Sequence, residues 1–192
     1  MKLIVGLGNP GKQYISTRHN VGFQWASELS DKLHITFRKE EKFHALCAHI
    51  GQGSDSLWLI CPQTYMNESG KAVLAICNFY KIDPEQVLVI HDELDLPPGV
   101  LKLKMGGGLG GHNGLKDIAT CLSTKKFWRL RIGIGHPGDK NLVADYVLRP
   151  PYKEDKSKIQ ESIIRSFEIW PLLIKEKYQE AMLKLHTKNC KT

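Results

Sequence analysis

The sequence predicts an α/β protein built on one mainly parallel or mixed β-sheet. Short apolar runs alternate along the chain with longer segments whose apolar residues recur every three or four positions. The short runs are typical of buried strands, and the longer pattern is typical of helices that lie on a sheet. Because 42% of the 192 residues are hydrophobic, the chain has enough apolar surface for one core, and we expect residues 1–192 to form a single domain.

Six segments have the length and composition of strands. Val87–Ile90 is wholly apolar, which favours a place in the middle of the sheet. The stretch G-Q-G-S-D at residues 51–55 is typical of a hairpin link between the second and third strands. In chain order, the predicted strands are Leu3–Leu7, Phe43–Ile50, Ser56–Cys61, Val87–Ile90, Gly99–Met105 and Trp128–Gly135.

Helices are predicted from the periodic segments between these strands. From Tyr152 the chain is predicted to be helical until Pro171 breaks the helix, and a basic helix then runs to about His186, with a frayed tail after it. The earlier predicted helices are Val21–Leu33, a segment with Val73, Leu74, Ile76, Cys77 and Tyr80 on its apolar face, and Leu115–Leu122, with a short apolar segment at Leu142–Leu148.

The charge and cysteine content narrow the class of protein. The chain has 27 Lys and Arg against 20 Asp and Glu, a net charge of +7, which favours an anionic partner such as a nucleic acid, with a merely solubilising surface as the alternative. The five cysteines form no C-x-x-C pair, which predicts buried thiols in a reducing cytosol rather than disulfides or a zinc site. No apolar run is long enough for a signal sequence or a membrane span, so we expect a soluble cytoplasmic protein.

Two glycine-rich stretches raise the possibility of a nucleotide site. Gly6–Gly11 reads G-L-G-N-P-G and fits G-x-G-x-x-G, but Pro10 lies inside the motif and the strand Phe43–Ile50 is followed by glycine and glutamine instead of a carboxylate. Gly106–Leu115 contains six glycines, and no G-K-[ST] follows it. Neither stretch carries a complete nucleotide signature, so we expect the second to clear space for another kind of ligand.

Polar residues follow four of the predicted strands. Ligands of open α/β sheets bind beyond the carboxyl ends of the strands, so these residues are expected to converge, although each one alone is also explained as a turn former or a helix cap. The residues are Asn9, His19, Asp92, the loop that carries Tyr65, Met66 and Asn67, and the loop that carries His112 and Asn113.

The residue types in this set favour hydrolysis by general-base catalysis. One histidine with one carboxylate is the minimum for activating water, and amide side chains are suited to binding peptide groups or polarising a carbonyl. No G-x-S-x-G is present for a serine nucleophile. The adjacent His91 and Asp92 point to opposite faces of a strand, which argues against both as ligands of one metal ion.

Five motifs are more specific than these patterns. They read V-G-L-G-N-P-G-K-Q-Y with T-R-H-N-V-G-F, P-Q-T-Y-M-N-E-S-G, H-D-E-L-D-L-P-P-G, G-G-G-L-G-G-H-N-G-L-K-D-I and R-L-R-I-G-I-G-H-P-G. In these motifs and in their order, residues 1–150 resemble the bacterial peptidyl-tRNA hydrolase family. The resemblance implies an esterase that cuts the bond between a peptide and the 3′ ribose of tRNA, and so recycles tRNA from peptidyl-tRNA released by stalled translation.

The resemblance also implies a fold and a set of partners. The expected fold is a single α/β domain with a twisted mixed sheet flanked by helices. The expected protein is a cytoplasmic monomer without a metal or other cofactor, and its partners are peptidyl-tRNA and stalled large ribosomal subunits. From the residues alone, a nucleotide-binding oxidoreductase, a non-catalytic RNA-binding module and a metallohydrolase remain alternatives.

Roles for individual residues follow from the same resemblance. His19 of T-R-H-N is expected to be the catalytic base and Asp92 to support it. Asn9 is expected to help distinguish blocked peptidyl substrates from free aminoacyl ones. The expected substrate-binding residues are Asn9, Tyr14, Tyr65, Met66, Asn67 and Asn113, and the expected tRNA contacts are Lys102, Lys104, His112 and Arg131. Leu183 stands where the family often has asparagine, which leaves a lid role of the C-terminal helices open.

Overall fold

The computed structural model describes residues 1–51, 53 and 56–187, and its strands form one seven-stranded sheet in the order β2-β3-β4-β1-β5-β7-β6. The four central strands β4, β1, β5 and β7 are parallel to one another, whereas β2 and β3 at one edge and β6 at the other pair antiparallel to their neighbours. The predicted α/β fold with a mixed sheet is therefore confirmed. The strands are β1 (Leu3–Gly6), β2 (Arg38–Glu40), β3 (Ala45–Ile50), β4 (Leu57–Pro62), β5 (Val87–Glu93), β6 (Leu101–Met105) and β7 (Trp128–Gly133).

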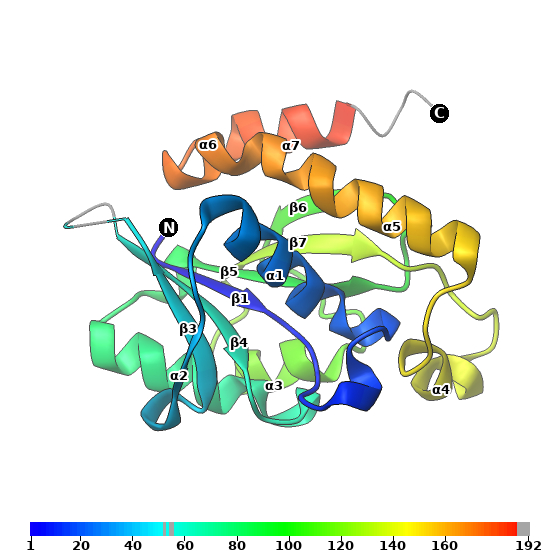
Figure 1. Cartoon of the computed structure of the whole chain (residues 1–192), viewed down its shortest axis with the longest axis horizontal. Coiled ribbons are helices and arrows are strands. Elements are labelled where there is room, and N and C mark those ends of the chain that lie inside the picture. The colour runs from blue at the N-terminus through cyan, green and yellow to red at the C-terminus, as the bar shows by residue number, and fades with distance from the viewer. Residues whose placement is uncertain (52, 54–55, 188–192) are drawn as a thin grey trace.

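Helices cover both faces of this sheet (Figure 1). Helices α1 and α5 lie on one face, α2 and α3 on the other, and α6 and α7 lie toward the β6 and β7 edge. The α-helices are α1 (Val21–Leu33), α2 (Ser69–Tyr80), α3 (Asn113–Cys121), α4 (Val143–Val147), α5 (Lys153–Ser166), α6 (Trp170–Ile174) and α7 (Tyr178–Thr187). Short 3₁₀ helices lie at Lys12–Tyr14, Arg18–Asn20, Glu41–Phe43, Met66–Glu68, Pro84–Gln86, Lys140–Leu142 and Phe167–Ile169.

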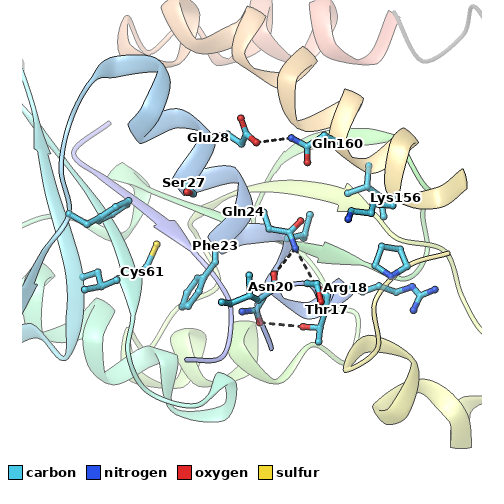
Figure 2. A pocket seen from close by; sticks show the side chains of 17 residues that line it. Thr17, Arg18, Asn20, Phe23, Gln24, Ser27, Glu28, Cys61, Lys156 and Gln160 are labelled. Atoms are coloured by element: carbon cyan, nitrogen blue, oxygen red, sulfur yellow. Dashed lines mark hydrogen bonds between the residues drawn. The ribbon is translucent and has the colours of Figure 1, made fainter. Parts of the chain in front are cut away.

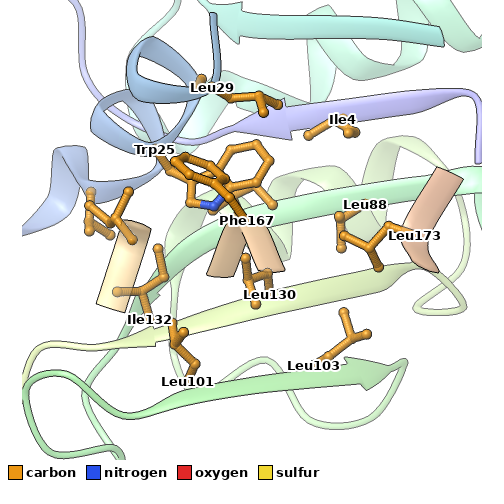
Figure 3. Packing of buried hydrophobic residues seen from close by; sticks show 14 of the residues in the cluster. Ile4, Trp25, Leu29, Leu88, Leu101, Leu103, Leu130, Ile132, Phe167 and Leu173 are labelled. Carbon is orange, nitrogen blue, oxygen red and sulfur yellow. The ribbon is translucent and has the colours of Figure 1, made fainter. Parts of the chain in front are cut away.

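A hydrophobic core lies on each face of the sheet because the strand side chains alternate. On the α1 and α5 face, the rings of Trp25 and Phe167 pack with centroids 5.4 Å apart above Leu88 and Leu130 (Figure 3). The indole N–H of Trp25 donates to Ser166 Oγ at 2.6 Å, so the one polar atom of this ring is satisfied. The opposite core joins Leu3, Val5, Val87 and Val89 to the apolar sides of α2 and α3.

Several predicted boundaries differ from the structure. The strand predicted from Phe43 begins at Ala45, because Glu41–Phe43 is a 3₁₀ helix and His44 has a positive φ of 50°. The short apolar segment at Leu142–Leu148 contains α4. Pro171 does not end a helix but lies in the first turn of α6, where its missing N–H is tolerated.

Two predicted features lie mostly outside the residues that the structure describes, whereas the predictions for the cysteines and for membrane spans fall within them. The predicted hairpin link and the predicted frayed tail fall largely on residues 52, 54–55 and 188–192, which lie outside the described ranges. Within those ranges, Cys47, Cys61 and Cys77 are free and buried, and burial raises the pKa of the Cys47 thiol to about 12. None of the described helices is both long and apolar enough to cross a membrane.

Candidate active site

A histidine and an aspartate form the centre of the site. Asp92 lies near the carboxyl end of β5 between two neighbouring strands, and its side chain is only 3% exposed. His19 belongs to the 3₁₀ helix Arg18–Asn20 that precedes α1. Its Nδ1 lies 2.9 Å from Oδ1 and 3.0 Å from Oδ2 of Asp92. The two residues predicted to act together are therefore in direct contact.

His112 joins this pair, which its predicted role as a tRNA contact did not anticipate. Its Nε2 lies 3.0 Å from Asp92 Oδ1, and its ring centroid is 4.8 Å from that of His19. The side chain is 7% exposed and also caps α3, because Nδ1 accepts a hydrogen bond from the backbone N–H of Leu115 at 3.4 Å. This position favours a role beside Asp92 over a role on the surface that meets the tRNA.

The hydrogen bonds fix which nitrogen carries the proton in each neutral histidine. A carboxylate accepts, so His19 donates through Nδ1 and His112 donates through Nε2. Because Nδ1 of His112 accepts from Leu115, its lone pair is occupied. In His19 the remaining Nε2 has a free lone pair, which is the group a general base needs.

The charges of the cluster stabilise an ionised Asp92. Burial alone would raise the pKa of the Asp92 carboxyl, but the charges and hydrogen bonds of His19 and His112 hold that pKa well below its ordinary value. Burial disfavours the charged His19 ring, yet the Asp92 carboxylate outweighs burial and raises the pKa of His19. By contrast, burial and the nearby His112 lower the pKa of His91 to about 3, so His91 stays neutral.

The glycine run Gly106–Gly111 brings His112 to this cluster by a path the sequence did not indicate. We expected the strand before it to end at the ligand edge of the sheet, and this expectation is wrong because β6 is antiparallel to β7. The chain must return along the sheet from Met105, which pairs with Trp128 at the other end of β7. Gly106 and Gly107 both have positive φ, at 60° and 87°, so the return path uses conformations that other residues adopt only with strain.

Arg129 holds this return path in place and was not singled out from the sequence. It is buried, and its guanidinium donates to the carbonyl oxygens of Gly106 and Gly108, the latter at 2.7 Å. The alternation W-R-L-R in β7 places Arg129 and Arg131 on one face. This alternation was the signal that the sequence contained. It did not show that Arg129 binds backbone carbonyls whereas Arg131 binds the Glu93 carboxylate.

Arg18 is a second residue that the sequence did not single out. It is buried beside His19, and its Nη1 donates to the carbonyl oxygens of Tyr146, Arg149 and Pro150 at 3.2, 3.2 and 2.9 Å. The guanidinium carbon lies 3.9 Å from the centre of the Tyr146 ring. Arg18 therefore connects the segment that carries His19 to the end of α4, whose residues line the same cavity as His19.

Asn9 is part of a buried network rather than a free side chain at a strand end. Its Oδ1 accepts the backbone N–H of Met66 at 2.8 Å. The side chain of Asn20 accepts from the backbone N–H of Asn9 and donates to its carbonyl oxygen, both at 2.9 Å. The amide NH₂ of Asn9 remains the group that this side chain can offer to a substrate carbonyl.

The other predicted substrate-binding residues divide into exposed and packed ones. Asn67 and Asn113 are exposed, Tyr14 is half-buried, and Tyr65 is 57% exposed. Asn113 lines a cavity of about 430 Å³ together with His19, Asp92 and His112. Met66 differs from the prediction, because its side chain is buried in the core and only its backbone N–H binds Asn9.

Three of the predicted tRNA contacts, Lys102, Lys104 and Arg131, lie on the edge strand β6 and its neighbour β7. Lys102 and Lys104 alternate with buried leucines on β6, so both lysines are exposed on the same face. Lys102 is the register partner of Arg131 on β7. Arg131 is partly buried and donates through Nε to Glu93 Oε2 at 2.7 Å, which leaves the two lysines as the freer cations of this surface.

Within the described residues, the same cluster forms a group of three side chains of metal-ligand types. Ligand atoms of His19, Asp92 and His112 lie within 4.8 Å of one another. The family resemblance implied no metal, and the residues alone left a metallohydrolase open. In the observed arrangement the nitrogens that face Asp92 donate protons to it, so a cation bound among these atoms would have to displace those protons.

A buried carboxylate that orients a histidine at the carboxyl edge of an α/β sheet is characteristic of an enzyme that uses acid–base catalysis. Comparison with known proteins identifies the enzyme family. The sequence profile of the family described as peptidyl-tRNA hydrolase matches residues 3–192. The peptidyl-tRNA hydrolase of Nitrosospira multiformis is 62% identical over 187 residues, which are 97% of this chain and 98% of the relative. That of Nitrosomonas europaea is 56% identical over 98% of this chain and 96% of the relative.

A solved structure agrees with these relatives. The crystal structure of peptidyl-tRNA hydrolase from Acinetobacter baumannii has a TM-score of 0.93 and 44% sequence identity, covering 97% of this chain and 94% of that one. The chain therefore belongs to the peptidyl-tRNA hydrolase family, and it is an enzyme of the hydrolase class. The family resemblance found in the five motifs is confirmed and extends through the C-terminal helices.

Proposed function

We propose that this protein hydrolyses the ester between a peptide, or an N-blocked amino acid, and the 3′ ribose of tRNA, with His19 as the general base. The contact of His19 Nδ1 with both oxygens of the buried Asp92 carboxylate carries this proposal. The protein would act as a cytoplasmic monomer on peptidyl-tRNA released from stalled large ribosomal subunits, and would return free tRNA to translation.

The chemistry begins with a water molecule at Nε2 of His19. Nε2 takes a proton from the water while the oxygen attacks the ester carbonyl, and the ionised Asp92 stabilises the resulting imidazolium. When the tetrahedral intermediate collapses, the bond between the carbonyl carbon and the ribose 3′ oxygen breaks, and Nε2 returns the proton to that oxygen. The products are a peptide acid and a tRNA with a free 3′ hydroxyl.

His112 serves this mechanism through Asp92. Its Nε2–H donates to the same Oδ1 that His19 contacts, so it adds a donor that favours the ionised carboxylate. Because its Nδ1 accepts from Leu115, the ring is held in one orientation by the start of α3.

Amide groups would hold the acyl part of the substrate. Asn9 would donate its NH₂ to a carbonyl of the blocked aminoacyl group, and the exposed Asn67 and Asn113 would bind the peptide backbone beyond it. One of these amides would also face the oxyanion, where a single donor is worth ~10²–10³ in rate.

The tRNA would bind through its backbone. A-form RNA is recognised by phosphate and 2′-hydroxyl contacts more than by sequence. The exposed Lys102 and Lys104 lie on the edge strand beside β7, on the face that the Gly106–Gly111 return path also follows. A backbone held there leads its 3′ end toward the cavity that contains His19.

The decisive experiment compares two substrates and two enzymes. Wild type is expected to release tRNA from an N-acetyl-aminoacyl-tRNA and to leave the unblocked aminoacyl-tRNA largely intact. His19→Ala is expected to lower kcat ~10²–10⁴-fold, the usual contribution of a positioned base. Near-normal cleavage by the variant would refute His19 as the base.

Two controls separate this function from the alternatives. A metallohydrolase would lose activity in a chelator, whereas we expect activity to be retained. A nucleotide-binding oxidoreductase would change its tryptophan fluorescence when titrated with a nicotinamide cofactor, and we expect no such change.

A further inference from the structure

We propose that Glu93 is a positioning residue, which holds the Arg131 guanidinium ready for one phosphate of the tRNA backbone. This inference rests on the proposed function and deepens it by naming the group that joins the RNA surface to the catalytic cavity. Glu93 is the last residue of β5, and it lines the same cavity as His19 and Asp92. Arg131 of the neighbouring strand β7 donates through Nε to Glu93 Oε2 at 2.7 Å.

The Glu93 carboxylate is held through both of its oxygens. Its side chain is 7% exposed. While Oε2 accepts from Arg131, Oε1 accepts from the backbone N–H of Asp95 at 3.3 Å. A Cβ added to Gly110 would lie 3.4 Å from Oε1, so the glycine run passes beside this carboxylate. Arg131 is therefore attached to a group that is itself fixed in the cavity wall.

The bond through Nε leaves the outer end of Arg131 available to a ligand. Within the described part of the chain, neither Nη atom of Arg131 has a hydrogen-bond partner, and the side chain is 18% exposed. The two Nη groups of a guanidinium form a planar fork that matches two oxygens of one phosphate. Because Glu93 orients the plane of this fork before the RNA arrives, less conformational freedom is lost on binding.

Arg18 and Arg129 provide a contrast, because their guanidinium groups bind backbone carbonyls of the protein itself. Arg18 lines a groove of about 490 Å³ between α1 and α5, and its side chain leads away from this groove toward α4, where it binds three carbonyl oxygens (Figure 2). Arg129 donates to the carbonyl oxygens of Gly106 and Gly108. Arg131 instead makes one bond to a carboxylate, so it keeps donors for a ligand.

The fork lies where the RNA surface meets the cavity. Arg131 and Lys102 are register partners on β7 and β6, so their side chains leave the sheet on the same face. An exposed lysine is a flexible point charge that binds a phosphate in many positions, whereas an oriented arginine defines one position. Glu93 would thus fix one phosphate relative to Asp92, its neighbour in the chain, and so set how far the 3′ end reaches toward His19.

The test separates the position of the Glu93 carboxylate from its charge. Glu93→Asp keeps the charge and withdraws it by one methylene, whereas Glu93→Gln keeps the length and an oxygen that can accept from Nε of Arg131. Arg131→Met removes the fork itself. Glu85→Asp is the matched control, because Glu85 is exposed just before the opposite end of β5.

Each protein is assayed on one N-acetyl-amino acid that is esterified either to tRNA or to adenosine, which carries no phosphate. Glu93→Asp should raise the tRNA KM ~10-fold, the effect of one misplaced charge-assisted contact. It should lower the ratio of kcat/KM for the tRNA ester to kcat/KM for the adenosine ester by the same factor. Glu93→Gln should raise the tRNA KM much less, and Glu85→Asp should not change it.

A double variant tests whether Glu93 acts through Arg131. If it does, adding Glu93→Asp to Arg131→Met should not raise the tRNA KM further. Additive losses in this double variant would overturn the proposal, as would an equal loss of kcat/KM on both esters. The opposite order, with Glu93→Gln impaired and Glu93→Asp normal, would also overturn it, because the charge and not the position of the group would then matter.

A binding measurement separates this proposal from the proposed function. Fluorescence anisotropy with labelled, uncharged tRNA needs no catalysis. Weaker binding to Glu93→Asp than to Glu85→Asp, with recovery in Glu93→Gln, would support the role of Glu93 even if wild type cleaved neither ester. Equal binding to Glu93→Asp and Glu85→Asp would reject this role even if the N-acetyl-aminoacyl-tRNA were hydrolysed normally.

Discussion

Replacing Asp92 with asparagine changes the proton position in His19 with little change in shape. Nδ1 of His19 now contacts both carboxylate oxygens, at 2.9 and 3.0 Å. In Asp92→Asn one of these oxygens becomes an NH₂ donor, which faces the Nδ1–H of the ring. The neutral ring relieves this conflict by moving its proton to Nε2, and the base is then lost.

The size of the effect follows from the contact that is lost. A hydrogen bond to a charged group contributes ~1.5–3 kcal/mol, which corresponds to ~10–150-fold in rate. Loss of the charge that stabilises the imidazolium adds to this, so we expect kcat to fall at least ~10²-fold. His112 cannot compensate, because its own Nε2 donates to the same carboxylate.

The pH profile provides a readout that a merely structural role would not change. His19 is active when neutral, so kcat/KM falls as the pH falls through its pKa. Burial lowers that pKa and Asp92 raises it, with a net rise. Without the carboxylate the burial effect remains, so in Asp92→Asn the acid limb of kcat/KM should move to lower pH.

The control is Asp95→Asn, which removes a more exposed carboxylate from the same cavity without contacting His19. We expect its acid limb to remain where it is in wild type. Initial rates of tRNA release from an N-acetyl-aminoacyl-tRNA, corrected for hydrolysis without enzyme, provide both profiles. If Asp92→Asn kept the wild-type rate or the wild-type acid limb, Asp92 would not control the protonation of His19.

Two further expectations concern the RNA surface and the support of the His19 segment. Lys102→Gln and Lys104→Gln should each weaken binding to all tRNAs and reduce the salt slope of the binding constant by about 1. Lys126→Gln is the surface control. An unchanged slope would place Lys102 and Lys104 outside the interface. Arg18→Met removes the guanidinium donor from three backbone carbonyls, of which those of Tyr146 and Arg149 keep a backbone N–H donor and that of Pro150 loses its side-chain partner. We therefore expect a loss of ~1–3 kcal/mol in the free energy of unfolding, measured by urea denaturation, together with a lower kcat. Full stability with normal kcat would show that the link to α4 is dispensable.

The central part of the fold was predictable because its strands are apolar on both faces. β1, β4 and β5 are covered by helices on each side, so their sequences are continuous hydrophobic runs. The edge strand β2 was missed because Arg38–Glu40 is exposed, and its three residues show no apolar alternation. The strand predicted from Phe43 began too early because Phe43 is apolar like the strand that follows, whereas it ends a 3₁₀ helix before the positive φ of His44.

The sequence predicted which residues belong to the candidate site better than it predicted how they contact one another. Asp92 and His19 were found from residue type and the family motifs, and their contact follows from the parallel order of β1 and β5. The place of His112 could not be derived in this way, because the direction of β6 depends on long-range pairing with β7 and not on local sequence. Arg129 was missed because its partners are backbone carbonyls, and such partners leave no complementary charge in the sequence.

The direction of β6 also explains why the glycine run is needed although no nucleotide signature is complete. A chain that ends at the far edge of the sheet must turn back along the sheet to reach Asp92, and it does so through positive φ values at Gly106, Gly107, Gly110 and Gly111, which other residues adopt only with strain. Arg129 fills the space below that path and binds its carbonyls, so the loop is held by the strand that it passes. The position of His112 therefore depends on Arg129 of β7, whereas the position of His19 depends on Arg18. The two histidines thus reach Asp92 from supports that are independent of each other. A single local distortion would then displace one donor and leave the carboxylate with the second, which keeps Asp92 ionised in its buried position.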